Sequence, residues 1–105
     1  MFFELRRYPI KPGKAAEWVK LMDEVIIPYQ LSKGMTVLAS FVNESGDTYV
    51  WIRRFATQEE RDALYDAVYQ TAYWQDQLSP IVGELIDRER IEVTILAATP
   101  GSFMQ

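Results

Sequence analysis

The sequence predicts an α+β fold of the ferredoxin-like type, with a four-stranded antiparallel sheet and helices on one of its faces. The chain has 105 residues, the length of one domain, so residues 1–105 are expected to form a single unit. Hydrophobic residues make up 49% and charged residues 25%, a balance that favours a folded core over disorder. Segments with strand and helix periodicity follow one another in the order β-α-β-β-α-β, which is the split βαβ pattern.

The first third of the chain is predicted to form a strand and a long helix. Apolar and polar residues alternate from Phe2 to Tyr8, which is typical of a strand. The segment Lys11–Lys14 contains Pro and Gly and separates the strand from the helix. From Ala15 to Tyr29 apolar residues recur every three or four positions, so one stripe of the helix faces a core. Pro28 is expected to kink or loosen this helix, and Gly34 to end it.

The middle of the chain is predicted to form a hairpin followed by a second helix. Met35–Val42 is apolar at both odd and even positions, and Thr48–Phe55 is rich in β-branched and aromatic residues. Asn43–Asp47 lies between these two strands and has the composition of a turn. Thr57 and Glu60 fit a capping box, so a helix is expected to begin directly after Thr57.

The last third of the chain is predicted to contain a further helix start and the final strand. Ser79–Pro80 resembles a helix N-terminus, with Pro80 at the first helical position. Apolar and polar residues then alternate from about Arg88 to Leu96, which predicts the fourth strand. Pro100–Gly101 ends that strand and is followed by a short tail.

The two middle strands predict that both faces of the sheet are covered. Neither Met35–Val42 nor Thr48–Phe55 has the polar side expected of a strand that faces water. The helices cover one face, and the simplest cover for the other is a second copy of the chain. We therefore expect a closed two-fold homodimer through the open sheet face. The alternative is that the C-terminal tail folds over that face.

Charge and hydropathy exclude several classes of partner. Eleven Lys and Arg against fifteen Asp and Glu leave a net charge of −4, which disfavours binding to nucleic acid or to an anionic membrane surface. No segment is long and apolar enough for a signal peptide or a membrane span. The expected localisation is cytoplasmic.

The chain contains neither Cys nor His, and this removes many kinds of chemistry. Disulfides, thiolate nucleophiles, the usual zinc sites, His-ligated haem and Ser-His-Asp catalysis are all excluded. The five glycines are scattered singly, so no phosphate-binding loop is present. No metal site and no cofactor are predicted.

Several segments spread along the chain resemble the NIPSNAP family. They are Phe3–Tyr8, Lys11–Lys14, Glu17–Trp18, Val25–Pro28, Trp51–Phe55, Glu60–Arg61 and Tyr73–Gln75. The resemblance implies a dimeric α+β barrel, in which two ferredoxin-like sheets pack face to face with the helices outside. The family commonly has a His and then a Trp two residues later where this chain has Trp51 and Arg53, so a role that depends on that His does not transfer.

Six side chains on two strands form the candidate ligand site. Alternation places three of them on one face of the first strand and three on one face of the third, and neighbouring strands lie ~4.8 Å apart. The resemblance to the wider barrel group implies that this face points toward the helices, where related proteins hold a cavity. Arginines, a carboxylate and aromatic rings together suit a planar, anionic or carbonyl-bearing ligand. These residues are Glu4, Arg6, Tyr8, Tyr49, Trp51 and Arg53.

Another interpretation of the same residues needs no ligand. Glu4 can pair with Arg6 or Arg53 as an internal ion pair beneath an ordinary aromatic core. The sequence leaves this alternative open.

Three functions remain compatible with the sequence. The leading one is a small homodimeric NIPSNAP-like protein that binds an aromatic or carbonyl-bearing small molecule. A cofactor-free oxygenase or isomerase, which are activities found in the wider barrel group, is the enzyme alternative. A non-catalytic interaction module is the third. The sequence identifies neither the ligand nor a reaction.

Overall fold

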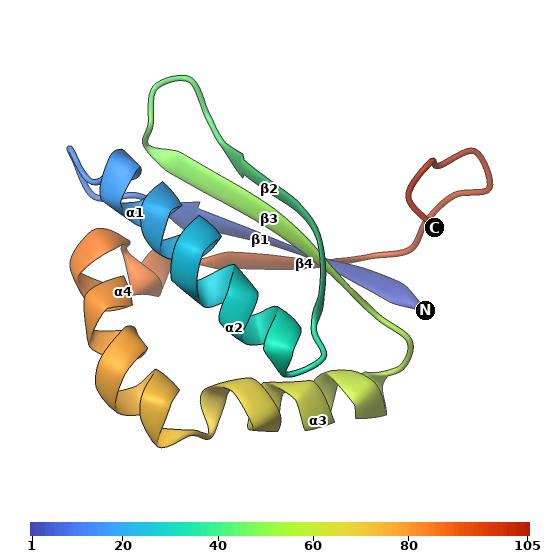
Figure 1. The fold of residues 1–105 in the computed structure, drawn as a ribbon. Helices are drawn as coiled ribbons and strands as arrows, with labels where there is room; N and C mark the ends of the chain where they lie inside the picture. The colour runs from blue at the N-terminus through green and yellow to red at the C-terminus, as the bar shows by residue number, and fades with distance from the viewer.

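Four antiparallel strands form one sheet in the order β2-β3-β1-β4. The computed structural model describes all residues 1–105. The expected α+β ferredoxin-like fold is confirmed, because the first and third strands lie side by side at the centre of the sheet (Figure 1). The strands are β1 (Phe2–Pro9), β2 (Thr36–Val42), β3 (Thr48–Phe55) and β4 (Glu92–Leu96).

The helices lie together on one face of this sheet (Figure 1). The first helical segment is continuous and consists of α1 (Ala15–Leu21), η1 (Met22–Ile26) and α2 (Ile27–Ser32). The second consists of α3 (Gln58–Tyr69) and, after a short break, η2 (Tyr73–Leu78) and α4 (Ser79–Leu85); a single 3₁₀ turn, η3 (Arg88–Arg90), precedes β4. None of these helices combines the length and the apolar character that a membrane span requires.

The first helical segment changes its winding where the sequence predicts a disturbance. Pro28 has no N–H to donate to the carbonyl one turn earlier, and the preceding turn, η1, is π-helical. The segment ends at Gly34, whose φ of 102° is a conformation that side chains disfavour.

The N-terminus of α3 has the predicted cap in a slightly different form. The Thr57 side chain accepts a hydrogen bond from the backbone N–H of Glu60 at 3.1 Å. The Glu60 carboxylate reaches back one residue further than expected and accepts from the N–H of Ala56 at 2.8 Å. The reciprocal bonds of the cap therefore satisfy the N–H groups of Glu60 and Ala56.

One predicted element boundary is confirmed and one is wrong. Ser79 begins α4 with Pro80 in its first turn, as predicted, although the chain already winds helically from Tyr73 and Leu78 keeps a helical backbone. The final strand begins at Glu92 rather than near Arg88, because Asp87 accepts a hydrogen bond from the N–H of Glu89 and caps a 3₁₀ turn.

A bulge in β2 accounts for part of its unusual pattern. The pairing with β3 shifts between Val37 and Ala39, so residues of the same parity face opposite sides of the sheet. Val37 lies opposite Arg53 on the helix side, whereas Phe41 lies opposite Val50 on the other side. Apolar residues at both parities therefore do not by themselves require two covered faces.

The face of the sheet opposite the helices stays largely uncovered, and we call it the open face. The C-terminal tail reaches one end of it, where Arg54 donates a hydrogen bond to the carbonyl of Gln105 and where Phe3 and Ile52 share a hollow with tail residues. Phe41 keeps 59% of its surface exposed. Phe3 also lies on this face and is buried. The other apolar residues on it include Leu5, Ala39, Phe41, Val50, Ile52 and Leu96.

Candidate functional site

The strand register brings the six candidate residues together on the helix side of the sheet. Each residue of β1 lies directly opposite one of β3, and the three pairs are Glu4 with Arg53, Arg6 with Trp51, and Tyr8 with Tyr49. Five of the six are buried, and Arg6 is partly buried. Their ligand-binding role stays a prediction, and the contacts divide them into two regions.

The first region is a closed ion pair between Glu4 and Arg53, both fully buried. The Nε and Nη2 atoms of Arg53 donate to Glu4 Oε1 at 3.0 and 2.5 Å. The guanidinium is also surrounded by aromatic rings and lies 4.6 Å from the ring centre of Trp51. This is the ion-pair arrangement that the sequence left open as an alternative.

Arg53 has no N–H left for a ligand. The N–H groups of a guanidinium number five, and two of those of Arg53 bind Glu4. The remaining three bind Gln30, Tyr69 and Tyr65 at 2.9, 2.9 and 2.7 Å. Arg53 therefore holds the helices to the sheet.

Helix α3 closes the other side of the Glu4 carboxylate. Arg61 donates to Glu4 Oε2 through Nε and Nη2 at 2.9 and 2.7 Å, and the Tyr65 hydroxyl donates to the same oxygen at 2.5 Å. Arg6 Nη1 stands 3.9 Å from Glu4 Oε1. The Glu4 carboxylate thus forms ion pairs with three arginines. We call Glu4, Arg53, Arg61 and Tyr65 the ion-pair cluster.

The ion-pair cluster shifts the pKa values of its members. Burial raises the pKa of Glu4, but the charge of Arg53 and the hydrogen bonds from Tyr65, Arg53 and Arg61 outweigh it, so the net pKa is lowered. Burial also raises the pKa of Tyr65 to about 12. Glu4 therefore stays ionised and Tyr65 stays protonated at neutral pH.

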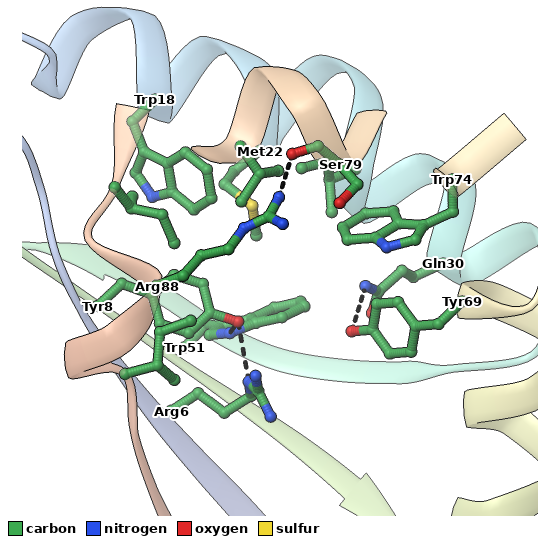
Figure 2. Close-up of a pocket in the computed structure, with 14 residues that line it drawn as sticks. Arg6, Tyr8, Trp18, Met22, Gln30, Trp51, Tyr69, Trp74, Ser79 and Arg88 are labelled. Atoms are coloured by element: carbon green, nitrogen blue, oxygen red, sulfur yellow. Dashed lines mark hydrogen bonds between the residues drawn. The ribbon is translucent and has the colours of Figure 1, made fainter. Parts of the chain in front are cut away.

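The second region is a cavity of about 270 Å³ between the sheet and the helices (Figure 2). Its volume is close to the lower end of the range for small-molecule sites, roughly 300–1,000 Å³. Ten of the 14 lining residues are hydrophobic, and none is Asp or Glu. The lining consists of Arg6, Tyr8, Trp18, Met22, Ile26, Gln30, Trp51, Tyr69, Trp74, Ser79, Val82, Ile86, Arg88 and Ile91.

Three of the six candidates form the polar floor of the cavity. The Tyr8 hydroxyl oxygen accepts hydrogen bonds from Arg6 Nε at 2.8 Å and from Trp51 Nε1 at 3.0 Å. Figure 2 shows this hydroxyl between the guanidinium and the indole, on the sheet side of the cavity. Burial outweighs the nearby Arg6 charge and raises the pKa of Tyr8, so the phenol stays protonated.

The helices supply the opposite wall and the rim. Tyr69, at the end of α3, accepts a hydrogen bond from the side-chain amide of Gln30 at 3.1 Å. Arg88 extends over the cavity and donates to the backbone carbonyl of Ser79 (Figure 2). Trp18 and Trp74 cover the cavity from the helix side.

The remaining three candidates do not line the cavity. Glu4 and Arg53 belong to the ion-pair cluster, and the Tyr49 hydroxyl forms a hydrogen bond of 2.6 Å with Ser40. The Tyr49 ring still packs against Tyr8, with 6.0 Å between the ring centres. No three Asp, Glu, His or Cys side chains lie close enough together to hold a metal ion.

Sequence reasoning missed the residues that the helices bring to the site. Arg61 lies in the first turns of α3, where charged side chains are usually solvated, but its guanidinium donates to Glu4. The one sequence signal that marks Gln30 is its position in an otherwise apolar stripe of the helix. In the structure its side chain is fully buried. Arg88 and Tyr65 carry no local pattern that separates them from surface residues.

Comparison with protein families gives one match, which covers almost the whole chain. The sequence model of the NIPSNAP family matches residues 3–101. None of the curated proteins compared with the chain matches it.

Solved structures with the same fold include NIPSNAP proteins and a monooxygenase. A NIPSNAP family protein from Agrobacterium tumefaciens is 26% identical with a TM-score of 0.86, covering 99% of this chain and 98% of that one. An uncharacterized NIPSNAP domain protein from Burkholderia xenovorans is 20% identical with a TM-score of 0.80, covering 97% and 98%. An antibiotic biosynthesis monooxygenase is 22% identical with a TM-score of 0.66, covering 95% and 100%.

Proposed function

This chain belongs to the NIPSNAP family, and we propose that it is a homodimeric protein that binds an aromatic or carbonyl-bearing small molecule in the helix-side cavity. The observation that carries this proposal is the lining of the cavity. All three tryptophans of the chain lie in it, together with the polar floor formed by Arg6 and Tyr8. Flat apolar walls with a few fixed polar groups are typical of sites for small planar ligands.

The helical turns beside the cavity support the same function. The π-helical turn η1 contributes Met22 and Ile26 to the lining, and the π-helical turn η2 contributes Trp74. Such turns cost stability relative to regular helix and occur frequently at functional sites. Here they lie on the two helical segments that enclose the cavity.

Intrinsic fluorescence tests the binding proposal directly, because every tryptophan lines the cavity. We expect 2-acetonaphthone or 2-naphthoate, two aromatic probes with a carbonyl group, to change the emission saturably. Ile91→Trp adds a large ring to the lining of the cavity and should abolish the response. Ile81→Trp, on the exposed side of α4, is the matched control and should leave it intact. No saturable response to either probe would refute the proposal.

The homodimer rests on the open face. Phe41 and Leu96, both on this face, keep 59% and 40% of their surface exposed, and the helices lie on the other side. Exposed apolar residues grouped in this way mark an interaction surface. A second copy of the chain covers the face by two-fold symmetry without leaving a further unpaired apolar face.

Sedimentation equilibrium tests the homodimer. We expect twice the chain mass of 12.2 kDa, and a return to the chain mass in Val50→Asp, because that variant buries an unpaired carboxylate in the interface. Lys20→Asp, on the exposed side of α1, is a control for the added charge and should stay dimeric. A wild-type protein that sediments as a monomer at all concentrations would contradict the homodimer.

A further inference from the structure

Two tyrosine hydroxyls of the cavity accept hydrogen bonds but donate none within the chain. The Tyr8 oxygen accepts from Arg6 and Trp51, and the Tyr69 oxygen accepts from Arg53 and Gln30 at 2.9 and 3.1 Å. The four partners are N–H groups, which donate and cannot accept. Each hydroxyl therefore keeps its proton free, and Figure 2 shows the two hydroxyls facing the cavity from opposite sides.

Arg6 also has spare donors. Its Nε binds Tyr8 and its Nη1 binds Tyr65 at 3.3 Å, which leaves three of the five N–H groups without a protein acceptor. Arg6 lines the cavity, and only 17% of its side-chain surface is exposed, so a ligand in the cavity lies beside a guanidinium with little access to solvent. Arg53, its neighbour on the sheet, has no spare N–H.

The cavity lining is short of acceptors and of negative charge. Glu4 is the only carboxylate that the buried arginines share, and it does not reach the cavity. Among the lining side chains, only Gln30 and Ser79 carry an oxygen with a lone pair still free. In addition, the indole Nε1 of Trp18 is buried without a hydrogen-bond partner. A site with several unused donors selects a group that only accepts.

We propose that the ligand of this cavity is an aromatic carboxylate, whose carboxylate is bound by Arg6 and by the hydroxyls of Tyr8 and Tyr69. This inference rests on the proposed function and specifies its ligand class. An ionised carboxylate has acceptors and no donors, so it matches the free N–H and O–H groups. Its negative charge balances the excess of arginine over carboxylate on this side of the sheet. The aromatic ring then lies among the tryptophans.

Three naphthalene probes of one shape separate the contributions of charge and of hydrogen bonding. 2-Naphthoate carries a carboxylate, 2-acetonaphthone a neutral acceptor, and 2-naphthamide an acceptor with two added donors. Titrations of the dimeric protein at pH 7 should give the tightest binding for 2-naphthoate, by roughly tenfold or more over 2-acetonaphthone. 2-Naphthamide should bind most weakly, because its N–H groups find few acceptors.

Substitutions assign this preference to named groups. Arg6→Met should weaken 2-naphthoate by roughly ten- to hundredfold and change 2-acetonaphthone by less than about threefold. Arg6→Lys keeps the charge and should restore part of the loss. Tyr8→Phe removes one hydroxyl and should weaken 2-naphthoate by roughly tenfold, whereas Tyr49→Phe, the matched buried tyrosine outside the cavity, should leave it unchanged.

The results that overturn this inference differ from those that overturn the binding function. If 2-acetonaphthone or 2-naphthamide binds as tightly as 2-naphthoate, the cavity binds aromatic compounds but does not select a carboxylate. If Arg6→Met keeps the full preference for 2-naphthoate, Arg6 is not its receptor and the inference is wrong. If none of the three probes binds, both proposals fail.

Discussion

The ion-pair cluster and the cavity floor lie two residues apart on the same strands, yet they are built in opposite ways. In the cluster, each N–H of Arg53 has a partner, and Glu4 receives five hydrogen bonds from Arg53, Arg61 and Tyr65. At the floor, Arg6 and Tyr8 retain donors that nothing in the chain accepts. The same alternation of polar residues therefore yields a closed scaffold at one end and an open donor site at the other.

The difference comes from what the helices place above each end of the sheet. Helix α3 brings Arg61 and Tyr65 directly onto the Glu4 carboxylate. Above Arg6 the chain offers indole rings and the apolar side chains of η1 and α4, which fill only part of the space. We infer that the cluster fixes the helices on the sheet and leaves the neighbouring floor free to bind.

Removing Glu4 should cause the largest effect. Glu4→Gln leaves the buried guanidinium of Arg53 without a counterion, and breaking a buried pair in this way costs about 3–5 kcal/mol. Urea unfolding of the variant and the wild type measures this loss of unfolding free energy. A loss below about 1 kcal/mol would show that the cluster does not hold the fold together.

The double variant Glu4→Gln with Arg53→Met serves as the control. It removes both buried charges, and Arg61 is partly exposed, so its freed guanidinium can reach water. An apolar side chain of similar length avoids the desolvation cost, so most of the lost stability should return. A double variant as unstable as Glu4→Gln would place the defect in packing rather than in charge.

Acid should weaken the protein through the same carboxylate. The pKa of Glu4 is lowered in the folded state, so its contribution is present above its unfolded pKa of about 4.3 and is lost as pH falls through the folded pKa. The difference in unfolding free energy between the wild type and Glu4→Gln should therefore shrink between pH 6 and pH 3. The same comparison for the exposed Glu17→Gln provides the baseline. If the difference in unfolding free energy between the wild type and Glu4→Gln stays constant with pH, the pKa of Glu4 is not lowered.

Removing Arg6 should change stability least. Arg6→Met leaves Tyr8 with its hydrogen bond from Trp51, and Glu4 keeps both of its closer arginines. No buried group loses its last partner, so the unfolding free energy should stay within about 1 kcal/mol of the wild type. Thermal melts of the two proteins side by side measure it. A loss of unfolding free energy as large as that of Glu4→Gln would mean that Arg6 stabilises the fold together with the ion-pair cluster.

The sheet and the shared face of the six residues could be predicted because both follow from local alternation. Period-two patterns in β1 and β3 fix which side chains share a face, and pairing of the central strands then sets Glu4 opposite Arg53. The family resemblance added that this face points toward the helices.

The division of the six residues could not be predicted, because it depends on contacts distant in sequence. Arg61 and Tyr65 reach Glu4 across 57 and 61 positions, and nothing in the sequence near them indicates a buried partner. The bulge in β2 and the π-helical turn η2 likewise carry no local signal in the sequence, whereas η1 precedes the predicted disturbance at Pro28. Both π-helical turns contribute residues to the cavity lining.

A crystal structure of the protein with 2-naphthoate tests the central claim most directly. We expect the carboxylate oxygens within hydrogen-bond distance of Arg6 and of the Tyr8 hydroxyl, with the rings among Trp18, Trp51 and Trp74. The ion-pair cluster should be unchanged, because Arg53 has no free donor. A naphthoate bound outside this cavity, or bound with its carboxylate turned toward solvent and away from Arg6, would contradict the assignment of Arg6 and Tyr8 as the binding floor.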